Sequence, residues 1–152
     1  MKNLRSLSQD VKMIKLLAIL ATISPAQSDL MQIRCMTTAI YHESRGEPLQ
    51  GQIAVGHVVM NRVASNRYPD DACEVVYQPN QFSYIERAKP DYDSLAWEVA
   101  TREAIMAYYR LTDDPTQGAK HYYAHDKVLP FWADDEKVTA VIEGHTFLKG
   151  VL

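Results

Sequence analysis

The sequence predicts an α+β fold in which helices come first and a small antiparallel sheet follows. In the first two thirds of the chain, apolar residues recur at helical spacing between glycine and proline breaks, and after Gly118 the period changes to two. A chain of 152 residues can bury one core, and 47% apolar and 23% charged residues are typical of a globular protein. We therefore expect a single, predominantly helical domain over residues 28–150 with a sheet at its C-terminal end.

The first predicted helix begins with Ser28 as N-cap and ends near Gly46, because glycine accepts the left-handed conformation that closes a helix. One stripe of this helix is apolar at helical spacing and should be buried: Leu30, Ile33, Thr37, Ile40 and Tyr41. Pro48 should open a second helix that is apolar nearly all round and therefore central. Gly51 and Gly56 within it indicate close approach by a neighbouring element.

The remaining elements follow from caps and alternation. We expect a short helical turn over 71–77, a strand over 81–85, and a long helix from Asp93 or Ser94 through Leu111. The predicted buried face of the long helix comprises Leu95, Val99, Met106 and Tyr109. Residues 121–124 alternate as a strand, and 138–142 with 145–148 read as a hairpin around Glu143-Gly144.

The N-terminal segment 1–26 has the composition of a signal peptide. Four basic residues precede an apolar run over 16–23, and Ser24-Pro25-Ala26 offers small residues at the two positions that a signal peptidase reads. The run is short for a bilayer span, so we expect no stable membrane span. The alternative is a basic, amphipathic first helix that stays on the protein.

Charge and cysteine content limit the choice of partners. A net charge of −3 gives no support for a general nucleic-acid binder, so no nucleic-acid partner is expected. Cys35 and Cys73 are the only cysteines; they would form one disulfide in an exported protein and two free thiols in a cytosolic one.

Glu43 is the candidate catalytic residue. It lies in the last turn of the first helix, where the helix dipole disfavours negative charge and so favours a protonated carboxyl. A protonated carboxyl is the general acid that a glycosidase needs. Glu47 lies beyond the helix break, with Arg45 between the two carboxylates. The residue pattern leaves open a second interpretation, in which Glu43 is a solvated acid paired with Arg45 or Arg62.

The chain resembles the SleB/CwlJ-type cell-wall hydrolases, which include the spore-cortex-lytic enzymes. The resemblance is carried, in order, by residues 39–48, 51–55, 61–63, 68–69, 81–83, 118–124 and 144–147. It covers about residues 30–149. It departs at His42, where an aromatic is common, and at Asn80, where glycine is common. It implies a lysozyme-like or lytic-transglycosylase-like catalytic domain that acts on peptidoglycan glycan strands. It also places the catalytic-acid role on Glu43.

The same resemblance implies the chemistry and the site. We expect cleavage of the MurNAc–GlcNAc β-1,4 bond by a lytic transglycosylase with Glu43 as acid and then base, because the 6-hydroxyl of muramic acid can serve as nucleophile. Hydrolysis by water stays open. No cofactor and no metal are expected. Cys35 and Cys73 resemble the paired cysteines of exported members, which implies a disulfide. The expected substrate-binding residues are Glu47, Gln52, Gln81, Phe82, Ser83, His121, Tyr122 and Tyr123, with Phe82 and Tyr123 as sugar-stacking rings or, equally, as core. Arg45 and Arg62 are expected to pair with Glu47.

We expect a monomer exported to the periplasm or cell envelope, or a phage-encoded endolysin that acts on the host wall. Three other functions remain. A zinc-dependent N-acetylmuramoyl-L-alanine amidase could use His121 and His125, although His42-Glu43 does not continue to a second histidine in the zincin spacing. A cysteine peptidase lacks a nucleophile signature around either cysteine. A non-catalytic wall-binding protein would have no need of an intact Glu43.

Overall fold

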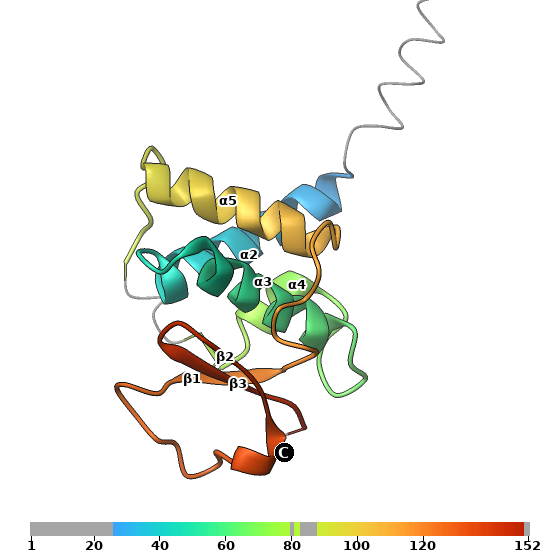
Figure 1. Ribbon diagram of the computed structural model, residues 1–152. Coiled ribbons are helices and arrows are strands. Elements are labelled where there is room, and N and C mark those ends of the chain that lie inside the picture. The colour runs from blue at the N-terminus through green and yellow to red at the C-terminus, as the bar shows by residue number, and fades with distance from the viewer. Residues whose placement is uncertain (1–25, 80, 83–87, 151–152) are drawn as a thin grey trace, which may run out of the picture. The chain divides into compact units, whose positions relative to one another are not determined.

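The computed structural model of the chain describes residues 26–79, 81–82 and 88–150. Figure 1 shows helices followed by a small sheet, as the sequence predicts. In chain order the elements are α2 (Gln27–Ser44), α3 (Leu49–Val63), α4 (Ala72–Val76), α5 (Leu95–Tyr108), β1 (His121–Ala124), the 3-10 helix η1 (Asp135–Lys137), β2 (Val138–Ile142) and β3 (His145–Leu148). The chain divides into two units, and the candidate site lies wholly within the second, Met31–Leu152.

Helix α2 begins at Gln27, so Ser28 lies inside the helix and is not its N-cap. The helix ends at Ser44, and Gly46 has a φ of 91°, which is the left-handed conformation expected of a glycine past a helix end. The predicted buried stripe is confirmed for Ile33, Thr37, Ile40 and Tyr41, whereas Leu30 is 48% exposed. Glu43 therefore stands in the last turn, as predicted.

Helix α3 is the central element of the helical part. Pro48 immediately precedes it as N-cap rather than as its first residue, and the Pro48 carbonyl accepts the N–H groups of Gly51 and Gln52. In Figure 1, α3 lies between α5 and the sheet, and it contacts both. The close approach predicted from its glycines occurs at Gly56, where a Cβ would lie 2.9 Å from the Ala107 Cβ of α5.

The buried face of α5 differs from the predicted one. Ser94 caps the helix by accepting the backbone N–H of Trp97, as expected, but Leu95 is 73% exposed and Tyr109 is 42% exposed. Of the other two predicted residues, Val99 is half-buried and Met106 packs against the core. The fully buried residues of α5 are small ones, Ala100, Ala104 and Ala107, together with Glu103. The glycine of α3 brings the two backbones so close that only small side chains fit between them.

The sheet has the strand order β1-β3-β2, with both pairs antiparallel. The predicted hairpin is confirmed, and Glu143 takes a φ of 49° in its two-residue turn. A bulge lies between Val138 and Ala140. The strand predicted over 81–85 is not seen at Gln81 and Phe82, which lie in a turn, and its remaining positions lie outside the described residues.

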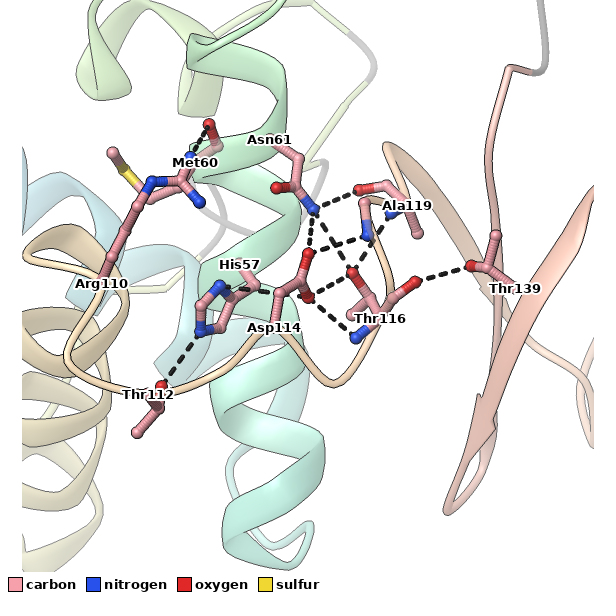
Figure 2. A network of polar contacts seen from close by, with 10 residues as sticks. His57, Met60, Asn61, Arg110, Thr112, Asp114, Thr116, Ala119 and Thr139 are labelled. Carbon is pink, nitrogen blue, oxygen red and sulfur yellow. Dashed lines mark hydrogen bonds and ion pairs between the residues drawn. The ribbon is translucent and has the colours of Figure 1, made fainter.

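A polar network fixes the loop between α5 and β1 to α3 (Figure 2). The carboxylate of Asp114 accepts the Asn61 amide at 2.8 Å, the Thr116 N–H at 2.8 Å and the Gly118 N–H at 2.9 Å. The Asn61 amide also donates to the carbonyl of Ala119 at 3.0 Å. These bonds join α3 to the residues immediately before β1, so they position the strand that carries part of the site.

Two further bonds extend this network. The buried His57 lies 3.1 Å through its Nε2 from the hydroxyl of Thr112, and the hydroxyl of Thr139 on β2 donates to the carbonyl of Thr116 at 2.7 Å. Figure 2 shows the network running from α3 through the loop to the sheet. The loop is therefore hydrogen-bonded on both sides.

Cys35 of α2 and Cys73 of α4 form a disulfide across a sequence separation of 38 residues. The predicted pairing is confirmed. Because both cysteines are oxidised, neither is available as the nucleophile of a cysteine peptidase in this state.

Candidate functional site

Glu43 faces a cavity of about 1080 Å³ between the end of α2, the loop after α3 and strand β1. That volume is at the upper end of what small-molecule pockets have, and it leaves room for an extended ligand. Residues that line the cavity include Glu43, Arg62, Asn66, Arg67, Tyr68, Gln78, Gln81, Lys120, His121, Tyr122, Tyr123, Phe131, Trp132 and His145. Among the described residues that line it, Glu43 is the only carboxylate.

The environment of Glu43 favours its protonated form. Burial raises the pKa of this carboxyl above its ordinary value, and a hydrogen bond from the hydroxyl of Tyr122, at 3.2 Å from Oε2, partly opposes that rise. Tyr122 is itself held by ring contacts with Phe147 and His145, at centroid separations of 5.6 and 5.5 Å. Burial raises the pKa of the Tyr122 phenol as well, so the phenol stays a proton donor to Glu43.

A second cluster in the cavity wall links α3 to β1. Arg62 of α3 is 4% exposed, and its Nε donates to the carbonyl of Lys120 at 2.7 Å. Its guanidinium lies over the ring of Tyr68, whose hydroxyl lies 3.3 Å from His121 Nε2. Burial lowers the pKa of His121 to about 4, with further lowering by Arg62 and Lys120, so this imidazole is neutral at physiological pH.

The structure brings half of the predicted substrate-binding residues to the cavity. Gln81, His121, Tyr122 and Tyr123 line it together with Glu43. The prediction for Ser83 falls outside the described residues.

Three predicted substrate-binding residues lie elsewhere. Gln52 is buried, its amide donates to the carbonyl of Glu47, and it does not line the cavity. The Glu47 carboxylate lies near Gly144, where its Oε1 is 3.7 Å from the place of a Cβ, and it does not line the cavity. Phe82 is 5% exposed and belongs to the core. Of the two predictions for this ring, sugar stacking and core packing, the structure therefore supports core packing.

The expected ion pairs with Glu47 are absent from the described residues. Arg45 instead places its guanidinium over the ring of Tyr41, 4.8 Å from the centroid. Arg62 lies over Tyr68 and over Phe82. Both arginines have carboxylates nearby in the sequence, but the helix break turns Glu47 toward Gly144 in the hairpin of the sheet.

Trp132 is one of the cavity residues that sequence reasoning missed. It lies in the segment after β1, with its ring centroid 5.8 Å from that of His121 and 5.9 Å from that of Tyr123. Neighbouring Phe131 is 99% exposed and lines the same cavity. The sequence signal that could have identified this residue is a pair of adjacent aromatic residues in a segment without apolar periodicity. Such rings do not belong to a predicted core face, so a place in a binding site is expected for them.

The described residues contain no group of three His, Cys, Asp or Glu side chains placed to hold a metal ion. His121 engages the hydroxyl of Tyr68, and His125 engages that of Thr146 through Nδ1 at 3.1 Å. These two histidines therefore have separate hydroxyl partners. No described helix has the length and apolar character needed to cross a membrane.

Comparison with known proteins gives a consistent set of relatives. A sequence profile of the cell-wall hydrolase family matches residues 46–148. The chain is 34% identical over 116 residues to a spore cortex-lytic enzyme of Halalkalibacterium halodurans, covering 74% of this chain and 33% of that protein. It is 31% identical over 121 residues to one of Bacillus cereus, covering 77% of this chain and 44% of that protein. The chain thus spans between a third and a half of the length of these relatives.

Two solved structures are similar to this one. The catalytic domain of the germination-specific lytic transglycosylase SleB from Bacillus anthracis has a TM-score of 0.67 at 30% identity, covering 84% of this chain and 98% of that domain. The catalytic domain of the Bacillus cereus SleB protein has a TM-score of 0.66, also at 30% identity, covering 84% and 94%. Glu43 lies just before the segment that the family profile matches but within the helix that leads into it.

Proposed function

The chain belongs to the cell-wall hydrolase family, and from this premise we propose that it cleaves the MurNAc–GlcNAc β-1,4 bond of peptidoglycan as a lytic transglycosylase. Glu43 serves as the general acid and then as the general base. The observation that carries this proposal is one carboxyl, with a raised pKa and a hydrogen bond from Tyr122, facing a cavity lined by aromatic and amide side chains.

A reaction with one carboxyl is chemically complete. The protonated Glu43 gives its proton to the glycosidic oxygen as the bond from that oxygen to C1 of muramic acid breaks, which releases the GlcNAc hydroxyl. The resulting carboxylate then takes the proton of the 6-hydroxyl of the same muramic acid as O6 bonds to C1. The product is a 1,6-anhydro sugar, Glu43 is protonated again, and no water is consumed.

Two physical features support this role for Glu43. Its place in the last turn of α2 adds the negative end of the helix dipole to the effect of burial, and both favour the protonated carboxyl. No second carboxylate of the described residues lines the cavity, which favours a mechanism whose nucleophile belongs to the sugar.

The first test is product analysis by mass spectrometry after incubation with purified peptidoglycan. The proposal expects anhydro-muropeptides. Products with a reducing-end muramic acid would show a hydrolase. Release of free stem peptides that stops when EDTA is added would show a zinc amidase. Walls bound without any cleavage product would show a non-catalytic binding protein.

The second test is Glu43→Gln, which keeps the shape of the side chain and removes its proton chemistry. The expected loss of wall lysis is at least about 10²-fold, the usual contribution of a general acid. Glu47→Gln is the matched control, and it should retain lysis because Glu47 does not line the cavity. Lysis at the wild-type rate by Glu43→Gln would end the assignment. Circular dichroism should show that both variants remain folded.

We also propose that the protein works outside the cytoplasm as a monomer. The disulfide between Cys35 and Cys73 supports export, because such bonds persist in oxidising compartments. Cell fractionation should place the protein in the envelope fraction, and sedimentation should give the mass of one chain. A purely cytoplasmic location with both thiols reduced would contradict export.

A further inference from the structure

We propose that the Glu43 cavity contains a carboxylate-binding site formed by Arg62, Arg67 and Lys120, which recognises an acidic group on the muramic acid unit of the substrate. This inference rests on the proposed function, since it takes the substrate to be peptidoglycan. It adds a reason why the enzyme would distinguish peptidoglycan from a neutral glycan.

The cavity is positively charged although the protein as a whole is acidic. Arg62, Arg67 and Lys120 line it, while Glu43, which burial favours in its neutral form, is the one carboxylate among its described lining residues. The whole chain has a formal net charge of −3. Long-range attraction to an anionic wall is therefore weak, and a local cationic surface must supply the attraction at short range.

Arg62 is the fixed part of the site. It is 4% exposed, its Nε donates to the carbonyl of Lys120, and its Nη1 is buried without a hydrogen-bond partner. Within the described part of the chain no carboxylate forms an ion pair with it. A buried guanidinium is normally paired, because an uncompensated buried charge is costly. A bound anion would supply the missing counter-charge.

The two flanking cations can move toward the ligand. Arg67 is exposed in the loop after α3, and Lys120 is half-buried immediately before β1, so their flexible side chains can reach an anion that sits against Arg62. The positive charges of Arg62 and Lys120 also act on the nearby His121, because both lower its pKa in addition to the effect of burial. A field that disfavours an imidazolium ion favours a carboxylate.

The chemistry of the glycan strand identifies where such a carboxylate comes from. The GlcNAc unit carries no ionisable group. The muramic acid unit carries a lactyl carboxyl, which is free in strands without peptides and is joined to the stem peptide in others, where the acidic residues of the peptide supply the carboxylates. Both sources present a carboxylate on the muramic acid side of the scissile bond.

The test measures binding of glycan strands to the Glu43→Gln variant, which does not consume them. The probes are strands with stem peptides and strands without them, each in native form and with its carboxyls converted to neutral amides by carbodiimide and ethanolamine. We expect binding of at least one native strand to be about tenfold tighter than that of its amidated form. The strand that shows this difference identifies the source of the carboxylate.

Arg67→Gln and Lys120→Gln, each added to Glu43→Gln, should weaken binding of the native strand about tenfold and leave the amidated strand unchanged. Lys89→Gln is the matched control, since it removes one exposed charge that does not line the cavity. Arg62→Lys tests the fixed cation; Arg67→Gln and Lys120→Gln keep the test valid if that variant does not fold.

The outcomes separate this inference from the proposed function. Equal affinity for native and amidated strands of both kinds, alongside wall lysis by the wild type, overturns the carboxylate site alone. Preference for native strands without any cleavage by the wild type supports the site and overturns the catalytic proposal. Failure of the variant to bind any strand overturns the carboxylate site, and it overturns the proposed function as well if the wild type does not lyse walls.

Discussion

At the scale of single residues, the chemistry of the site depends on two opposing effects on the pKa of Glu43. Burial raises the pKa of the carboxyl, and the Tyr122 hydroxyl, which donates to Oε2, lowers it. The net effect is a raised pKa, so burial is the stronger of the two. Tyr122 therefore sets how far the pKa rises and holds the carboxyl in one orientation.

Replacing Tyr122 by Phe should move the pH dependence of lysis in a defined direction. The variant removes the hydrogen bond that stabilises the carboxylate, so the pKa of Glu43 should rise further. A general acid loses activity as pH rises through its pKa, and the alkaline limb of the kcat/KM profile should therefore shift to higher pH. The profile is measured with a soluble glycan strand.

Tyr123→Phe is the matched control, because its hydroxyl has no contact with Glu43 among the described hydrogen bonds. Its alkaline limb should coincide with that of the wild type. If the alkaline limb of Tyr122→Phe stays at the wild-type pH or moves to lower pH, the role given to the phenol is contradicted.

At the scale of elements, the contact between α3 and α5 depends on the absence of a side chain. A Cβ at Gly56 would lie 2.9 Å from Ala107 Cβ and 3.2 Å from Ile40 Cδ1. Both neighbours belong to packed helices and cannot move freely. The two helices are thus as close as a glycine permits, which is why α5 presents alanines there.

Gly56→Ala should lower the free energy of unfolding although alanine favours helix by about 1 kcal/mol. Overpacking of a dense core costs about 1–3 kcal/mol, and this cost should exceed the helix gain. Urea unfolding measures the difference. Adding Ala107→Gly to Gly56→Ala removes the clashing methyl group. The loss in free energy of unfolding of the double variant should therefore be smaller than the sum of the losses of the two single variants.

Gly51→Ala is the control within the same helix. A Cβ there would lie 3.3 Å from Glu47 Cβ, which belongs to a more exposed side chain that can shift. We expect Gly51→Ala to be neutral or stabilising. A Gly56→Ala protein as stable as Gly51→Ala would show that the helices can separate without loss.

At the scale of the whole molecule, one disulfide and four histidines with lowered pKa values contribute to stability. The disulfide closes a loop across 38 residues between α2 and α4. His42, His57, His121 and His145 all have pKa values below the usual value, and burial is the largest cause for each. The folded protein therefore binds fewer protons at these histidines than the unfolded chain does.

Removing the disulfide by Cys35→Ser with Cys73→Ser should reduce the free energy of unfolding by about 3–4 kcal/mol in the chain-entropy model. Urea unfolding with and without reductant measures the loss, and the double variant should not respond to reductant. Thiol titration of the denatured, unreduced wild type should find no free thiol. Two free thiols would contradict the bond.

Acidification should destabilise the protein. The unfolded histidines take up protons near pH 6.5, whereas the folded ones resist protonation to lower pH, and for His121 to about 4. Stability should therefore fall as pH is lowered from about 7 toward about 4. Glu43 has the opposite effect on stability: its pKa is raised in the folded state, so acidification favours folding at this one group. The four histidines together should outweigh it. The midpoint of urea unfolding, measured as a function of pH, reports the combined effect of these groups on stability.

The variant His57→Gln separates one contribution. Its side chain can still donate to or accept from Thr112, but it does not titrate. The loss of stability on acidification should be smaller in this variant. A wild-type midpoint that stays constant or rises as pH falls would contradict the account.

The sequence by itself determined those features that depend on short-range interactions. The end of α2 just before Gly46, the cap at Ser94, and the alternation in β1 and the hairpin follow from backbone preferences over a few residues. The position of Glu43 in a last helical turn follows from the same local signals. The segments that resemble the cell-wall hydrolases were enough to indicate the family.

The tertiary structure alone decided which side chains meet across the chain. It buried Phe82 and Gln52, turned Glu47 away from the cavity and brought Trp132 to it. It also left Arg62 without a carboxylate partner in the described part of the chain. These outcomes depend on how closely helices approach and where loops return, and such long-range packing is not encoded in the spacing of residues along one segment.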